Sequence, residues 1–150
     1  MLTTLQREAL DAQGWVLLPS VVSAEALREL QRWAEEQLKA TGHDTESLVF
    51  LPNAVRDHLA LNQWMLSGPL GAIGRAALGA QSVRLLQDGI LHKPAQCPDN
   101  VPWHCDHTYL GYLVPPRVVS VRVALTSASE QTGCLKIRPG SHRWATPNLA

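Results

Sequence analysis

Apolar residues recur every three or four positions through the first half of the chain, which is the spacing of one face of an α-helix. The clearest run lies between Ser23, a suitable N-cap, and Gly42, a residue that is able to end a helix. The residues on its apolar face are Ala26, Leu27, Leu30, Ala34 and Leu38. Those on its polar face include Glu29, Arg32, Glu36 and Lys39. The pattern predicts an amphipathic helix that buries one side.

Capping signals predict further helices on both sides of this one. Thr3 and Gln6 match a Thr-x-x-Gln capping box, and Gly14 suits the left-handed position that follows a helix. Pro69 stands where a first helical residue is expected, and Gly79 where such a helix stops. The additional predicted helices cover 4–13, roughly 53–66, and 69–79.

The pattern changes to β type in the second half of the chain. Runs rich in β-branched residues alternate there with a Pro-rich loop at 93–102 and a Glu-Gln-Thr-Gly turn at 130–133. With one short run near the N-terminus, the predicted strands are 15–18, 83–92, 118–125 and 134–138. Helices first and antiparallel strands after predict an α+β fold built on a β-sandwich or barrel. We expect a single domain, 1–150, with a helical part at 1–80 and a β part at 81–150.

Thirteen Lys and Arg balance thirteen Asp and Glu, so the formal net charge is zero. A chain without net charge has no general attraction to nucleic acid or to an anionic membrane, and neither partner is expected. No apolar run approaches the roughly 18 residues of a membrane span, and the N-terminus lacks the pattern of a secretory signal. Three cysteines without a CxxC pair are expected to be reduced thiols. Together these features predict a cytoplasmic protein.

The candidate chemistry is concentrated in one His-Cys-Asp triplet in the middle of the chain. If the triplet lies on a strand, His104 and Asp106 point to one face while Cys105 and His107 point to the other. An imidazole and a carboxylate on one face make two arms of the two-histidine, one-carboxylate triad that binds Fe(II) and leaves positions open. The pattern alone also fits a hydrogen-bonded surface pair.

Four segments around this triplet follow one another in a characteristic order. They are QDGILHKP at 87–94, WHCDHTY at 103–109, VVSVRVAL at 118–125 and GCLKIRPGSHR at 133–143. In residue types, order and spacing they resemble the phytanoyl-CoA dioxygenase (PhyH) family of Fe(II)/2-oxoglutarate oxygenases. The opening GWVLLP at 14–19 resembles the start of that family. The resemblance extends over nearly the whole chain.

The resemblance implies N-terminal helices packed on a double-stranded β-helix, or jelly roll, in which His104 and Asp106 ligate iron. It implies Fe(II), 2-oxoglutarate as cosubstrate, and O₂. The reaction it implies decarboxylates 2-oxoglutarate to succinate and hydroxylates a small organic substrate. The side chains expected to line the cosubstrate and substrate site are Gln87, Trp103, Tyr109 and Arg122. Cys105 stands where the family usually has Gln, and Arg122 where Trp is frequent.

The family's second histidine ligand and the arginine that clamps 2-oxoglutarate lie well after the Pro-Gly-Ser-His turn. This chain ends eight residues after His142, which is expected to be a turn residue and not a ligand. The sequence is therefore expected to represent the N-terminal part of an oxygenase with an incomplete jelly roll. Open sheet edges and apolar inner faces predict self-association.

Two other interpretations remain open at the level of sequence. One is a non-catalytic jelly-roll binding or interaction module without a complete iron site. The other is a hydrolytic or structural zinc protein that uses His104, Asp106 and His107, although strand geometry places His107 on the opposite face.

Overall fold

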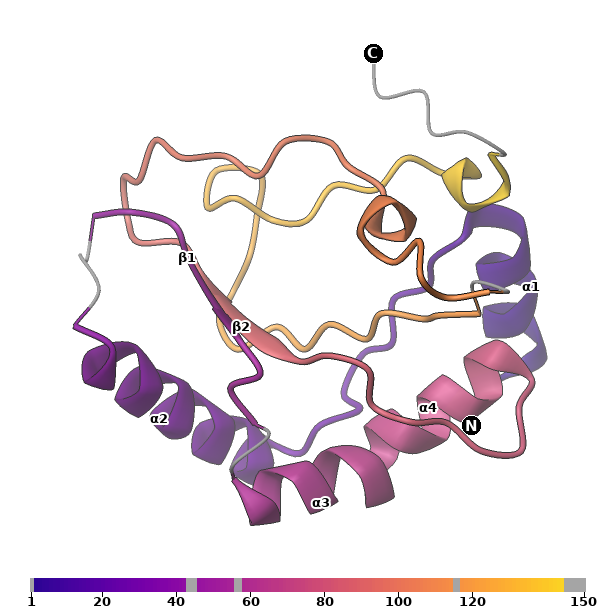
Figure 1. Cartoon of the computed structure of the whole chain (residues 1–150), viewed down its shortest axis with the longest axis horizontal. Coiled ribbons are helices and arrows are strands. Elements are labelled where there is room, and N and C mark those ends of the chain that lie inside the picture. Colours follow the sequence, from indigo (N-terminus) through magenta and orange to yellow (C-terminus); the bar gives the residue numbers. More distant parts are fainter. Residues whose placement is uncertain (1, 43–45, 56–57, 115–116, 145–150) are drawn as a thin grey trace.

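Helices make up most of the first half of the chain, and a small antiparallel sheet packs with them. The fold is therefore α+β, as expected. The computed structural model describes residues 2–42, 46–55, 58–114 and 117–144 (Figure 1). Its α-helices are α1 (Thr4–Gln13), α2 (Ala24–Ala40), α3 (Leu59–Ser67) and α4 (Pro69–Leu78). Its strands are β1 (Val49–Pro52) and β2 (Gly89–His92), and two short 3₁₀ helices are η1 (Asp106–Tyr109) and η2 (Ser141–Arg143).

The predicted capping residues fix the ends of three helices. The Thr3 hydroxyl accepts from the Gln6 backbone N–H while the Gln6 side chain accepts from the Thr3 N–H, so the capping box that opens α1 is confirmed. Ser23 caps α2 through the Ala26 N–H. Pro69 is the first residue of α4, and Gly79 closes that helix at a φ of 58°.

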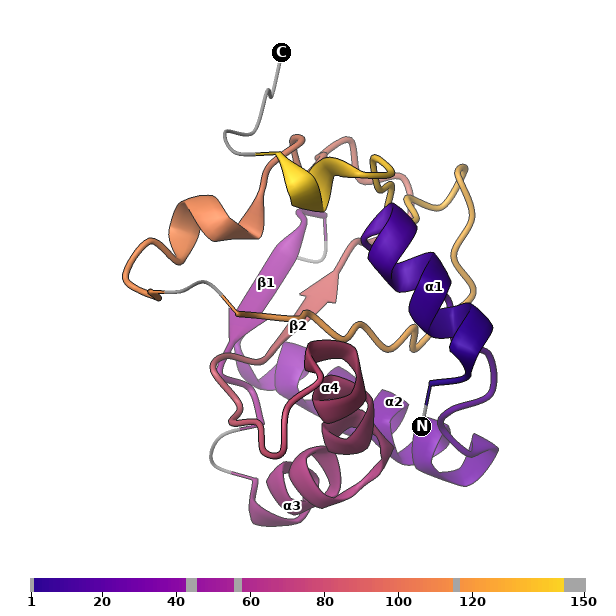
Figure 2. The same ribbon diagram turned by 90° about the vertical axis from the view of Figure 1, so that its right-hand side faces the viewer.

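The core lies between α2 and the two-stranded antiparallel sheet, which are neighbours in the fold (Figures 1 and 2). Burial alternates along β1, so that Val49 and Leu51 face inward while Phe50 is exposed. Ala34 of α2 and Ile90 of β2 complete the buried cluster. The residues that pack around this cluster are Trp33, Leu38, Ala54 and Leu125. The apolar face predicted for α2 is therefore the face that covers the sheet.

Polar contacts attach α1 to the rest of the chain, and none of its residues is fully buried. The Asp11 carbonyl, near the end of α1, accepts from His142 Nε2 at 3.2 Å and from the Arg143 guanidinium. The Gly140 N–H donates to the Gln13 carbonyl at 2.9 Å. Basic side chains at a helix C-terminus are also favoured by the helix dipole. The Pro-Gly-Ser-His turn therefore binds the first helix, and His142 is the turn residue that the sequence predicts.

Several predicted strands are wrong. Residues 15–18, 118–125 and 134–138 have no strand pairing, and of 83–92 only β2 forms a strand. A strand exists only where a neighbour supplies backbone hydrogen bonds, and β1 and β2 make the one sheet in the described ranges. The described residues thus show a two-stranded sheet where a jelly roll was expected.

The region around β1 also differs from the prediction. A helix was expected over 53–66, whereas α3 starts at Leu59, after His58 as its N-cap. The alternation in Val49–Pro52 was not identified in the sequence, because four residues ending in proline are a weak strand signal. No helix in the described ranges combines the length and the apolar character that a membrane span requires.

We expect Gly14→Ala to destabilise the protein more than Gly42→Ala does. Both glycines have positive φ, 84° and 60°, so both variants carry the backbone cost of alanine in the left-handed region. A Cβ at Gly14 would lie 2.4 Å from the His142 ring, whereas a Cβ at Gly42 meets nothing within 4 Å. Overpacking costs about 1–3 kcal/mol, and urea unfolding should show a difference of that size. Equal losses in the two variants would contradict the contact.

We also expect the chain to associate. It exposes 11181 Å², whereas a folded monomer of 16.4 kDa exposes about 7,500 Å². Exposed apolar residues in the extended segments include Val118, Val121, Leu135 and Ile137. Light scattering should give a mass above that of the monomer, and Val121→Lys should lower it, while Leu5→Lys, on the exposed face of α1, should not. A cooperatively unfolding monomer at all concentrations would contradict this prediction.

Candidate functional site

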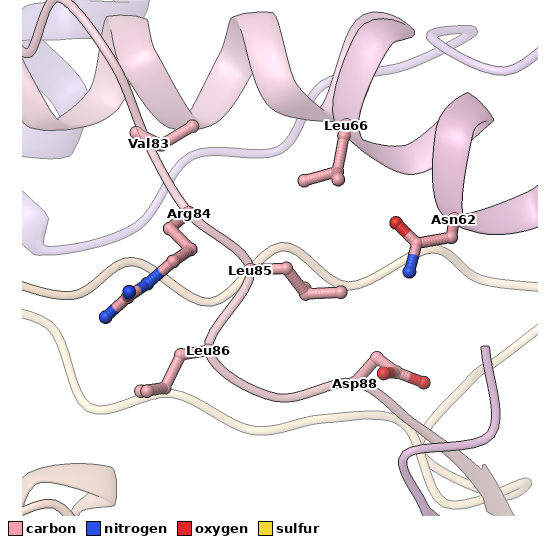
Figure 3. Close-up of a pocket in the computed structure, with 7 residues that line it drawn as sticks. All are labelled: Asn62, Leu66, Val83, Arg84, Leu85, Leu86 and Asp88. Atoms are coloured by element: carbon pink, nitrogen blue, oxygen red, sulfur yellow. The ribbon is translucent and has the colours of Figure 1, made fainter. Parts of the chain in front are cut away.

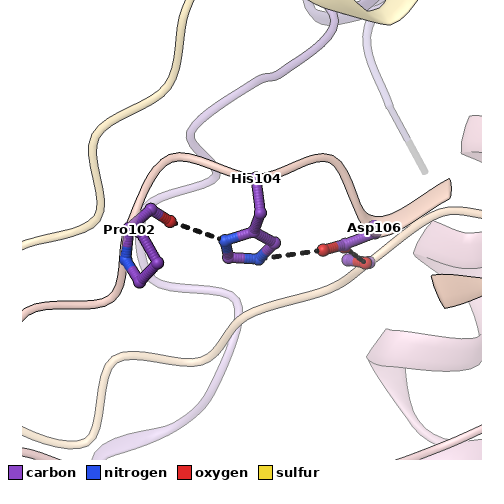
Figure 4. Close-up of polar contacts among 4 residues, drawn as sticks. Pro102, His104 and Asp106 are labelled. Atoms are coloured by element: carbon purple, nitrogen blue, oxygen red, sulfur yellow. Dashed lines mark hydrogen bonds and ion pairs between the residues drawn. The ribbon is translucent and has the colours of Figure 1, made fainter. Parts of the chain in front are cut away.

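The predicted site lies in an irregular loop and not on a strand. His104 has no regular secondary structure, and Asp106 is the first residue of η1 (Asp106–Tyr109). The expectation that a strand aligns the two side chains is therefore wrong. The side chains nevertheless meet, because the backbone turns into η1 directly after His104 and brings the carboxylate back toward the ring (Figure 4).

The two ring nitrogens of His104 face two different acceptors. Nδ1 lies 2.9 Å from the Pro102 carbonyl oxygen, and Nε2 lies 3.4 Å from Asp106 Oδ1 (Figure 4). A carbonyl only accepts, so Nδ1 carries a hydrogen and donates it. This contact fixes the orientation of the ring and directs Nε2 toward the carboxylate.

The contact between Nε2 and the carboxylate is favourable when a positive charge lies between the two atoms. An ionised carboxylate has only lone pairs to offer, and an unprotonated Nε2 also presents a lone pair. Two lone pairs facing each other repel, so a proton on Nε2 or a metal ion bound by both atoms would favour this arrangement. The side chains of His104 and Asp106 are 36% and 61% exposed, so a cation from solvent can reach both.

Two further side chains contact this pair. The Ser120 hydroxyl donates to Asp106 Oδ2 at 3.0 Å, although it follows Asp106 by 14 residues. The Tyr109 ring lies edge-on to the His104 ring, with centroids 5.9 Å apart and planes at 64°. Tyr109 was predicted to line the site, whereas Ser120 was missed. Its signal in the sequence is a single small hydroxyl within the apolar run VVSVRVAL.

The other predicted lining residues do not contact the pair in the described part of the chain. Trp103 is 59% exposed, and Gln87 and Arg122 are also exposed, with no hydrogen bond or ring contact to His104 or Asp106. Their role toward a cosubstrate or substrate stays a prediction.

Among the described residues, no group of three or more His, Cys, Asp and Glu side chains is placed to hold a metal ion. His104 and Asp106 therefore have no third protein ligand there. His142 donates to the Asp11 carbonyl. The side chain of His107, which the zinc interpretation requires, lies outside what the structure describes. The three cysteines are free thiols.

A pocket of about 290 Å³ lies between α3 and the segment before β2, and its lining includes none of the predicted site residues. Leu85 points toward Leu66 and Asn62, whereas Arg84 turns to the other side (Figure 3). Asp88 accepts from the Val55 N–H at 2.7 Å and thereby holds the chain before α3. The Asp88 carboxylate of this pocket therefore serves the fold, and the candidate site is the loop pair.

His104 and Asp106 are chemically suited to share one ion. Their facing atoms are 3.4 Å apart, which is slightly wider than the separation of about 3.0 Å between neighbouring ligand atoms that lie about 2.1 Å from a six-coordinate metal. One imidazole and one carboxylate are also the mixed N and O donors that Fe(II) takes in open sites. The donor set and its exposure fit a metal with several positions left for other ligands.

Comparison with known proteins gives one family. A family model described as phytanoyl-CoA dioxygenase (PhyH) matches residues 10–149. No curated protein and no solved structure matches the chain. The matched range includes the His104 loop, Ser120 and the Pro-Gly-Ser-His turn, so it covers the motifs on which the resemblance rests.

We expect long-range ¹H–¹⁵N correlation spectra to show a protonated Nδ1 in His104, because the Pro102 carbonyl accepts from it. His142 is the matched control, since its Nε2 donates to the Asp11 carbonyl and should carry the hydrogen instead. An unprotonated Nδ1 in His104 would show that the ring does not have this orientation in solution.

Proposed function

Because the chain belongs to the phytanoyl-CoA dioxygenase family, we propose that it serves an Fe(II)/2-oxoglutarate-dependent oxygenase reaction on a small organic substrate. The observation that carries the proposal is the approach of His104 Nε2 to Asp106 Oδ1 at 3.4 Å, with Nδ1 held by a carbonyl. We propose these two side chains as iron ligands and a jelly roll as the complete fold around them.

The chemistry of the reaction resides in the bound groups. Bound iron would supply the activation of O₂ that couples decarboxylation of 2-oxoglutarate, to succinate and CO₂, with insertion of one oxygen atom into a C–H bond of the substrate. No general acid or base of the protein is required for that exchange, so the task of the chain is to hold, orient and shield.

Specific residues of this chain are suited to that task. His104 offers Nε2, and the Pro102 carbonyl keeps the ring from turning. Asp106 offers a charge that lowers the free energy of a bound cation. Tyr109 lies edge-on to the imidazole and limits the space on one side of the ring. Trp103, Gln87 and Arg122 are proposed to contact cosubstrate or substrate.

A non-catalytic binding module is the second candidate. It is favoured by one observation, that only two suitable ligands meet in the described part of the chain. Two protein ligands bind Fe(II) weakly, with solvent in the remaining positions. The two candidates differ in whether 2-oxoglutarate strengthens iron binding and whether succinate forms.

We expect His104→Ala and Asp106→Ala each to weaken Fe(II) binding at least tenfold, since each removes one ligand. Anaerobic titration of the full chain, with and without 2-oxoglutarate, measures this. An oxygenase should also form succinate when O₂ is admitted, and both variants should lose that activity.

Two variants control for the loss of an imidazole or a carboxylate elsewhere. His142→Ala removes a ring that contacts Asp11, and Asp11→Asn leaves the backbone carbonyl that His142 uses. Both should bind iron as the unaltered chain does. Fe(II) binding that is unchanged in His104→Ala and Asp106→Ala would refute the proposed site. Fe(II) binding without formation of succinate would favour the non-catalytic binding module.

A further inference from the structure

The two oxygens of the Asp106 carboxylate have different neighbours. Oδ1 lies 3.4 Å from His104 Nε2, while Oδ2 accepts from the Ser120 hydroxyl at 3.0 Å. The terminal torsion of an aspartate is broad and roughly two-fold, so an unsupported carboxylate can present either oxygen, or both, to a cation. The serine hydroxyl therefore selects the oxygen that faces the imidazole.

Ser120 is itself held by contacts on both sides of its segment. The Arg117 guanidinium donates to the Leu78 carbonyl at the end of α4, at 2.7 Å. On the other side, the Gln31 side chain of α2 donates to the Leu125 carbonyl, and Leu125 packs against the core. The hydroxyl is thus presented to Asp106 from a segment that is attached to two helices.

The donor is also neutral, which matters for a metal ligand. Arginine or lysine at this place would bind the same oxygen but would compensate the negative charge that attracts a cation. In the described part of the chain, Asp106 forms no ion pair with a lysine or an arginine. The hydroxyl therefore orients the carboxylate and leaves its charge available.

We propose that Ser120 is a positioning residue, which holds Oδ2 and leaves Oδ1 alone to bind the metal. This inference rests on the proposed function, because it takes Asp106 as a ligand. Binding through one oxygen leaves open a coordination position that a bidentate carboxylate would occupy, and the reaction needs such positions for cosubstrate and O₂. Partners of ligating groups typically contribute 10–100-fold in metal affinity.

The test is a titration of the full chain with Co²⁺ alone, followed by its ligand-field absorption under anaerobic conditions. We expect Ser120→Ala to weaken Co²⁺ binding about tenfold or more and to change the shape of the absorption band, because the carboxylate is free to bind through both oxygens. Ser120→Thr keeps the hydroxyl and favours extended backbone, so it should restore the affinity to within about threefold. Ser129→Ala, which removes a hydroxyl that contacts Thr132 in a turn, should bind as the unaltered chain does.

The outcomes separate this inference from the proposed function. If His104→Ala and Asp106→Ala lose Co²⁺ binding but Ser120→Ala keeps both affinity and spectrum, Ser120 has no positioning role and the proposed site stands. If Ser120→Thr loses as much as Ser120→Ala at equal thermal stability, the hydroxyl is not the cause, and the inference is overturned. If none of the variants, including His104→Ala and Asp106→Ala, affects binding, the proposed function fails as well.

Discussion

The packing of α2 on the two strands is the contact on which the rest of the molecule depends. Ala34 of the helix is buried together with Ile90 and Leu51 of the sheet. The same helix then holds the segment that follows residue 117, through the hydrogen bond of Gln31 to the Leu125 carbonyl. A core made of few residues thereby determines where the second half of the chain runs.

The candidate site depends on this core through a short series of polar contacts. Ser120 belongs to the segment that α2 and α4 hold, and its hydroxyl reaches Asp106. Asp106 in turn faces His104, whose other nitrogen is bound by the Pro102 carbonyl. Each contact restricts one rotation, so the imidazole and the carboxylate are oriented before any ion arrives. Such preorganisation lowers the cost of binding a metal, although both side chains are exposed to solvent.

The proximity of His104 and Asp106 was predictable, but the reason for it was not. Strand parity was the argument from the sequence, and the structure has a loop and a 3₁₀ turn instead. Side chains two residues apart can meet in either conformation, so the correct pairing did not depend on the correct backbone. Ser120 could not be predicted in the same way, because its contact spans 14 residues and depends on how the 118–125 segment is held.

The sequence by itself determined α1, α2 and α4, because their signals are local. A capping box at Thr3, an N-cap at Ser23 and a proline at position 69 act within one turn of the residues that they order. Strands were decided only by tertiary structure, since a β-rich segment becomes a strand when another segment supplies its hydrogen bonds. The segment 118–125 has the composition of a strand but no such partner in the described ranges, whereas Val49–Pro52 has a weak pattern and pairs with β2. Residue types and their order identify the family and two candidate ligands, and the packing of distant segments decides how those ligands are held.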